Sequence, residues 1–169
     1  MFNTFRTVML GGALALAPIA ASAATLIEDG NTYTIGYTEA EFIGDVEASG
    51  GAGSFTVTFE ADVDPVTANA AATIGNINLA QFSDLTISWL DDSMNVLSSA
   101  AITVGSTDLS TVFTAPNLTQ VLQITWSDST DIGNFDIEVA ATVPLPAGGL
   151  LLLTALGGGA ALRRKKKSA

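Results

Sequence analysis

At residues 55–60 the chain reads Phe55-Thr56-Val57-Thr58-Phe59-Glu60, a strict alternation of apolar and polar side chains. Successive side chains of an extended strand point to opposite faces, so Phe55, Val57 and Phe59 share one side. A strand with one apolar side has to bury that side against another layer. The stretch therefore predicts a β-strand that faces a core on one side and water on the other.

The same alternation returns in both directions along the chain. Residues 85–89 read Leu85-Thr86-Ile87-Ser88-Trp89, and the polar run 91–95 then predicts a turn before Val96. Two further runs share a face in the same way, namely Leu122, Ile124 and Trp126, and Phe135, Ile137, Val139 and Ala141. Weaker strand candidates lie at residues 33–37, 42–46, 73–79, 98–104 and 111–113.

Together these runs predict one all-β domain over residues 24–142, an antiparallel β-sandwich of about 8–10 strands. Two packed sheets explain why strands with a single apolar face suffice. The side chains expected in the shared layer are Phe55, Phe59, Trp89, Trp126 and Phe135. Two stretches depart from the pattern: the alanine-rich residues 68–72 suggest a short helix or a loop, and residues 39–42 suggest one helical turn.

Charge is distributed very unevenly along the 169 residues, which include 17 acidic and 6 basic side chains and neither Cys nor His. Every cation lies near an end, at Arg6 or in the run 163–167, so residues 24–142 carry all the carboxylates and no counterion. The chain therefore lacks a thiolate nucleophile, an imidazole base, a Cys/His zinc site and a disulfide. Nucleic acid is an unsuitable partner for such an anionic domain.

The first 23 residues have the pattern of a secretory signal peptide. A cation at Arg6 precedes a ten-residue apolar stretch from Val8 to Ala17, and small residues follow at Ala21 and Ala23. Signal peptidase accepts small side chains at the last and third-last positions before its cut, so we expect a signal helix that is removed after Ala23.

The last 27 residues have three parts in a fixed order. Residues 143–147, where Pro144 and Pro146 favour an extended backbone, precede an apolar stretch over 147–162. As a helix the apolar stretch is about 24 Å long against a hydrocarbon core of roughly 30 Å, so it predicts a marginal transmembrane helix. A stop-transfer cluster follows, made of Arg163, Arg164, Lys165, Lys166 and Lys167. By the positive-inside rule this basic tail stays cytoplasmic, and the acidic domain lies outside the membrane.

Val143, Pro144, Leu145, Pro146 and Ala147 match letter for letter the VPLPA variant of the PEP-CTERM sorting signals of Gram-negative bacteria, which this tail resembles. The resemblance implies that an exosortase, a membrane peptidase of cysteine-transpeptidase type, cuts at or near the motif. It further implies transfer or release of the outer part to the cell surface or to an exopolysaccharide matrix. It covers residues 143–169 alone and implies nothing about the fold or activity of residues 24–142. An ordinary permanent anchor is the alternative interpretation of the same tail.

Carboxylates also pair near predicted strand ends and turns, at Asp62 and Asp64, at Asp91 and Asp92, and at Asp128 and Asp131. Loop oxygens of this kind can converge on calcium, although none of the pairs has the EF-hand pattern. Solvated turns are the alternative, because Asp side chains bond to local backbone. If calcium binds, Asp128 and Asp131 are the first candidates; no other cofactor is expected.

An enzyme is not expected. Glycoside hydrolysis needs two carboxylates in different environments, and nothing in the sequence marks out such a pair or supplies a cation to stabilise an anion. The sequence therefore predicts an exported, non-enzymatic surface or matrix protein with signal peptidase and exosortase as processing partners. A calcium-dependent or carbohydrate-binding adhesion module is the alternative, and a secreted carboxylate hydrolase is the third possibility.

Overall fold

The structure, a computed structural model, describes residues 24–130 and 133–143. Strands are the dominant secondary structure of these residues, which confirms the all-β fold predicted from the sequence. The described part contains twelve strands, more than the eight to ten expected, because it includes three strands of only two residues each. Its one helix is the four-residue α1, Asn76–Leu79.

Two five-stranded sheets make up the body of the domain. Sheet A has the order β1-β3-β12-β5-β9, with β1 Thr25–Leu26, β3 Glu41–Glu47, β12 Asn134–Thr142, β5 Val66–Ile74 and β9 Gly105–Phe113. Sheet B has the order β2-β4-β10-β7-β8, with β2 Thr32–Ile35, β4 Gly53–Ala61, β10 Thr119–Trp126, β7 Thr86–Asp91 and β8 Val96–Ala101. A small third sheet pairs β11, Asp128–Ser129, with β6, Phe82–Ser83.

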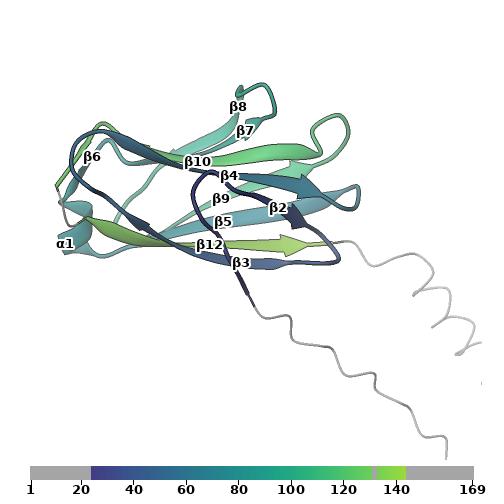
Figure 1. The fold of residues 1–169 in the computed structure, drawn as a ribbon, viewed down its shortest axis with the longest axis horizontal. Coiled ribbons are helices and arrows are strands. Elements are labelled where there is room, and N and C mark those ends of the chain that lie inside the picture. The colour runs from purple at the N-terminus through teal and green to yellow at the C-terminus, as the bar shows by residue number, and fades with distance from the viewer. Residues whose placement is uncertain (1–23, 131–132, 144–169) are drawn as a thin grey trace, which may run out of the picture.

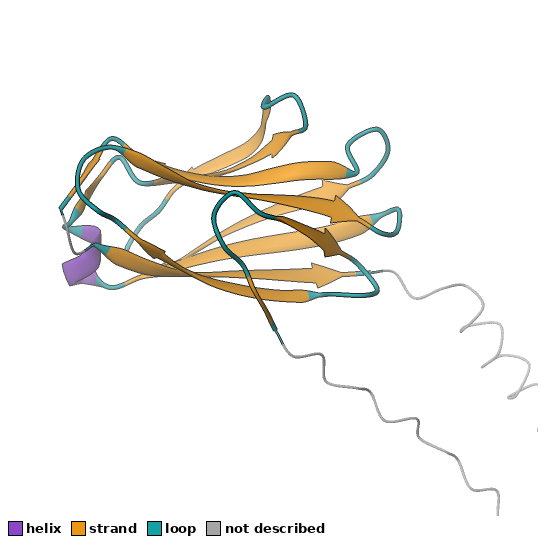
Figure 2. Ribbon diagram, viewed as in Figure 1, coloured by secondary structure: helices purple, strands orange, loops and turns teal. Residues whose placement is uncertain are grey.

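Sheets A and B lie one above the other as two layers (Figure 1; Figure 2). Aromatic side chains from the two sheets meet between them, with the ring centroids of Phe42 and Phe59 5.1 Å apart and those of Trp89 and Phe113 5.8 Å apart. Near α1, Phe82 packs against both Trp126 and Phe135, at 5.6 and 5.5 Å. All five aromatic residues expected in the shared layer are buried.

The described residues form a hydrophobic core between the two sheets. Its fully or nearly fully buried hydrophobic residues run from Ile27 to Val139, and Val143 packs against the cluster as a half-buried neighbour. Residues 24–143 therefore supply both layers of their own core. Since the apolar interior is the main source of folding free energy, this segment is expected to fold as an independent unit.

Pairing between neighbouring strands is antiparallel except at the first two strands of the chain. β1 runs parallel to β3, with Thr25 opposite Phe42, and β2 runs parallel to β4, with Thr32 opposite Thr58. The connection between β1 and β2 thus crosses from the edge of sheet A to the edge of sheet B. The purely antiparallel sandwich expected from the sequence is wrong at these two edges.

Side chains from sheet B close the opposite side of the sandwich, where β9 is the edge strand of sheet A. The indole Nε1 of Trp89 donates to the Leu109 carbonyl at 2.9 Å, and the buried Gln120 amide donates to the Val112 carbonyl at 2.9 Å. The Thr111 hydroxyl donates to the Gln120 side-chain oxygen at 2.8 Å. The side-chain oxygen and nitrogen of the buried Gln120 therefore both form hydrogen bonds. Together with the Trp89 bond, they connect β7 and β10 of sheet B to β9 of sheet A.

The structure corrects the two helical expectations. Residues 68–72 lie in the middle of β5, where Ala68, Ala70 and Ala72 are fully buried between β12 and β9. Small inward side chains suit this position because the large Trp89 side chain crosses from the other sheet nearby. Its indole donates a hydrogen bond to the carbonyl of Leu109, which pairs with Ala70. Residues 41–42 likewise belong to β3 and not to a helical turn. Conversely, the expected strand over 73–79 stops at Ile74 and gives way to α1.

Candidate functional site

The last strand leads directly into the predicted processing motif. β12 pairs with β3 as far as Ala140 and with β5 as far as Thr142, which lies opposite Thr67. The Ala141 amide also donates to the Ala40 carbonyl at 2.7 Å. Val143, the first residue of the motif, is half-buried and packs against the core. No spacer therefore separates the sheet from the motif.

The other predicted processing residues lie outside the described residues. These are Ala21 and Ala23 before the signal peptidase cut, Pro144, Leu145, Pro146 and Ala147 of the motif, the apolar stretch 147–162, and Arg163, Arg164, Lys165, Lys166 and Lys167. Within residues 24–130 and 133–143, no helix is long and apolar enough to cross a membrane.

The two candidate calcium ligands are only partly described. Asp128 lies in β11, is exposed, and its carboxylate accepts a 3.0 Å hydrogen bond from the Ser129 amide. Asp131 lies outside the described residues. Nowhere in the described ranges do three or more acidic side chains gather closely enough to hold a metal ion.

Asp62 acts as a clamp on the connection between β2 and β3. Its carboxylate accepts hydrogen bonds from the Tyr37 amide at 3.0 Å, the Thr38 amide at 3.2 Å and the Thr38 hydroxyl at 2.7 Å. Slight burial raises the pKa of Asp62, but the bonds from Thr38 and Tyr37 outweigh it and hold the pKa below the usual value of 3.8. This carboxylate is occupied as a structural acceptor.

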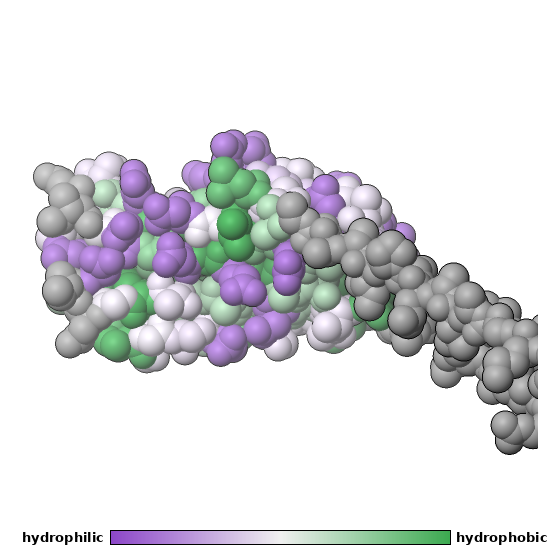
Figure 3. Space-filling model, turned by 90° about the horizontal axis from the view of Figure 1, so that it is seen from below, coloured by the Kyte–Doolittle hydropathy of each residue, from purple (hydrophilic) through white to green (hydrophobic). Residues whose placement is uncertain are grey.

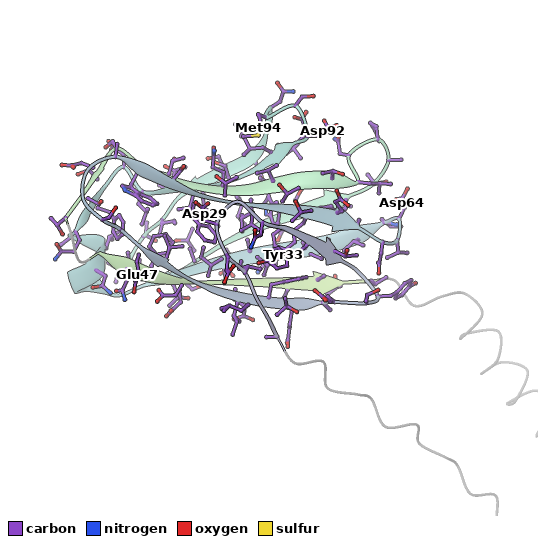
Figure 4. All side chains as sticks on the ribbon, in the orientation of Figure 1. Asp29, Tyr33, Glu47, Asp64, Asp92 and Met94 are labelled. Atoms are coloured by element: carbon purple, nitrogen blue, oxygen red, sulfur yellow. The ribbon has the colours of Figure 1, made fainter. Side chains whose placement is uncertain are left out.

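Asp91 plays a similar part in the turn between β7 and β8. One of its oxygens accepts from the Asn95 amide at 2.8 Å and the Ser93 amide at 2.9 Å, and the Asn95 side chain donates to the other at 2.9 Å. The bonds from Asn95 and Ser93 lower the pKa of Asp91. The labelled neighbours Asp92 and Met94 mark this turn at the tip of the hairpin (Figure 4). These contacts are those of a side chain that stabilises a turn, which is the alternative to calcium binding for the Asp91 and Asp92 pair.

The outer face of sheet A gathers acidic side chains that the sequence scatters over three strands. Asp45 of β3 lies directly opposite Asp136 of β12, two exposed carboxylates with no cation among the described residues. The same face carries Glu41, Glu47, Asp108 and Glu138. Figure 3, the view from below, shows hydrophilic residues around a hydrophobic column on this face. The exposed Leu26 and Ile43 line a shallow hollow here, together with Asp45, Asp136 and Glu138.

A second hollow opens at the side of the sandwich where the chain crosses from β1 to β2. We call it the lateral hollow; it has a volume of about 500 Å³ and is lined by residues 26–29, 45–47, 49–50, 52–55 and Trp126. The acidic groups Glu28, Asp29, Asp45 and Glu47 stand around it, and Val46, Phe55 and Trp126 lie at its base. Asp29 and Glu47 are labelled in Figure 4 on the crossing segment and at the end of β3.

Sequence reasoning missed the lateral hollow, although one signal was present. Acidic residues recur at Glu41, Asp45 and Glu47, two or four positions apart, which places them on one face of a strand. Which strand pairs with the edge of β3, and for how many residues, is decided by the long-range order of the sheet, so the sequence did not reveal the hollow. The two tryptophans offer no exposed platform for a sugar, since Trp89 is 0% and Trp126 only 8% exposed.

No family model matches the chain, and no curated protein matches it.

Proposed function

We propose that this chain is an exported, non-enzymatic surface or matrix protein of a Gram-negative bacterium, processed at both ends. The observation that carries the proposal is the order of the C-terminal parts, a VPLPA pentapeptide, an apolar stretch and five adjacent cations. In this proposal residues 1–23 form a signal helix, residues 147–162 a transmembrane helix, and residues 24–142 the ectodomain. The tail then holds the domain at the inner membrane, on the periplasmic side, until an exosortase cuts.

The described domain supports this proposal by its charge and its composition. Residues 24–142 contain no Lys or Arg, so the cations are confined to the segments proposed to steer the chain through the membrane. The sheet also ends at Thr142, directly before the motif, so the predicted boundary between the domain and the sorting signal coincides with the end of β12.

Mass spectrometry of the mature protein tests both ends together. We expect loss of about the first 23 residues and of the residues beyond the motif, with the domain recovered from the cell surface or the medium. A Pro144→Ala/Pro146→Ala variant should accumulate in the inner-membrane fraction with its tail intact. Thr154→Ala, in the apolar stretch, is the matched control and should be processed normally. An intact tail on the mature wild-type protein would instead establish a permanent anchor.

The alternative functions are separated by two measurements on the same domain. Calcium that raises the melting temperature by several degrees, with the shift removed by EDTA and by Asp128→Asn, would favour a calcium-dependent adhesion module. Hydrolysis of a glycan that is abolished by changing a single Asp or Glu would establish an enzyme.

A further inference from the structure

The lateral hollow contains main-chain groups of β3 that no neighbouring strand covers. The Ile27 amide donates to the Ile43 carbonyl at 2.8 Å, so Ile43 turns its main-chain groups away from β12 and toward β1. Because strand residues alternate, Asp45 and Glu47 turn their amide and carbonyl groups to the same side. β1 ends at Leu26, opposite Ile43, and its register does not reach them. The edge of β3 is therefore open from Asp45 to Glu47.

The edge of sheet B that faces the hollow is occupied by the segment that crosses from β1 to β2, through residues 29–31. The Asp29 carboxylate accepts from the Thr56 amide at 2.6 Å, and the Gly30 amide donates to the Thr56 carbonyl at 2.7 Å. The Thr58 amide continues this contact by donating to the Asn31 carbonyl at 3.0 Å. An added segment would thus find its hydrogen-bonding partners on β3 and not on this part of β4.

The side chains around the open edge define what such a segment would carry. Val46 points inward and is buried, while Asp45 and Glu47 point outward and are exposed. A strand added beside β3 continues the pleat, so its residues alternate between the apolar base of the hollow and the outer carboxylates. Glu28 and Asp29 add negative charge from the crossing segment.

We propose that the lateral hollow binds an extended peptide segment that adds to β3 as an extra strand and alternates apolar with cationic side chains. The apolar side chains lie against Val46, Phe55 and Trp126, and the cationic side chains meet Asp45 and Glu47. A second copy of the folded domain cannot supply the cations, because its described residues include no Lys or Arg. The chain's own basic run, residues 163–167, has five adjacent cations and no alternating apolar residues, so it does not match this pattern. The partner is therefore a different basic segment, and this inference does not depend on the proposed route of export.

Hydrogen exchange and NMR titration of residues 24–143 test the proposal. The probe is an acetylated and amidated hexapeptide with the sequence Lys-Val-Lys-Val-Lys-Val. We expect it to shift the Asp45 and Glu47 amides, to slow their exchange with solvent, and to bind more weakly as sodium chloride is added. A peptide of equal composition in the order Lys-Lys-Lys-Val-Val-Val is the control and should bind at least tenfold more weakly.

Matched variants separate the hollow from general attraction to an acidic protein. Glu47→Gln should weaken binding by about twofold to fivefold, the usual worth of an exposed ion pair. Glu41→Gln removes the same charge from the same face of β3 outside the hollow and should leave binding unchanged. Unchanged amide shifts elsewhere would verify that both variants are folded.

Several results would overturn the proposal. These are no shift at millimolar peptide, equal binding of the two peptides, equal effects of the two substitutions, or binding that leaves the exchange of the Asp45 and Glu47 amides unaltered. Calcium alone is titrated in parallel; if calcium shifts the same amides and displaces the peptide, the hollow is a cation site and not a peptide groove.

Discussion

Asp62 fixes a part of the domain where the backbone has little support of its own. The connection it holds includes Gly36, whose φ of 149° favours glycine, and a Cβ at that position would collide with the Asp62 carboxylate. The glycine and the aspartate therefore depend on each other. We expect loss of either one to loosen the connection between β2 and β3.

An Asp62→Asn variant should lose stability in a way that depends on pH. The pKa of Asp62 is lowered in the folded state, so the ionised form stabilises the fold above the unfolded value of about 3.8, and this contribution is lost as the pH falls through the folded pKa. We expect the difference in unfolding midpoint between wild type and variant to be largest at pH 7 and to shrink below about pH 4. Urea unfolding from pH 7 to pH 2.5 measures it. A difference that stays constant over this range would contradict the clamp.

Gly53 is required by a close contact with a tryptophan. A Cβ at this position would lie 2.5 Å from Cζ2 of Trp126, whose indole is held by a 3.1 Å hydrogen bond to the Gly51 carbonyl. Gly53→Ala should therefore displace the ring and lower the free energy of unfolding by about 1–3 kcal/mol. Gly75→Ala, where a Cβ meets nothing within 4 Å, is the control and should change stability by less than about 0.5 kcal/mol. Equal losses in the two variants would argue against the contact.

At the scale of strands, the sequence predicted best where alternation and aromatic residues coincide. The runs that begin at Phe55, Leu122 and Phe135 lie in β4, β10 and β12, and the run that begins at Leu85 continues into β7; their apolar residues point inward. β5 was missed because alanine favours helices, and its strand state is imposed by hydrogen bonds to β12 and β9. The lateral hollow was missed for a related reason. It exists because β1 stops pairing with β3 at Leu26, and local sequence patterns do not reveal the extent of such a long-range pairing.

The pairing of β3 with β12 sets two like charges against each other. Asp45 and Asp136 lie directly opposite, and such pairs are destabilising at the short side-chain spacing of an antiparallel sheet. Asp136→Asn should therefore raise the melting temperature at low salt by about 1–4 °C. Glu41→Gln, opposite Ala140, should have a smaller effect.

The double variant sharpens this test. Because one substitution already removes the repulsion, Asp45→Asn should add little to Asp136→Asn. Additive effects in thermal melts of the single and double variants would show that the two carboxylates act through the overall charge and not as a pair.

At the scale of the whole molecule, the domain is an acidic body without internal counterions. The 17 carboxylates of residues 24–142 repel one another over distances that salt screens to about 8–10 Å at moderate ionic strength. The melting temperature of the domain should therefore rise between low salt and the salt concentration of sea water. Sodium and potassium chloride should act alike at equal ionic strength. A flat or falling curve would contradict this account.

Because β12 ends directly before the proline motif, few residues would remain between the domain and a new carboxyl end made by cleavage in the motif. A cut anywhere within residues 143–147 leaves a stub of at most five residues, no longer than about 17 Å when fully stretched. Whatever is joined to that new carboxyl end is held at this range from the sandwich. In the proposed attachment, the end of the sandwich where β12 finishes is therefore the end nearest to the matrix.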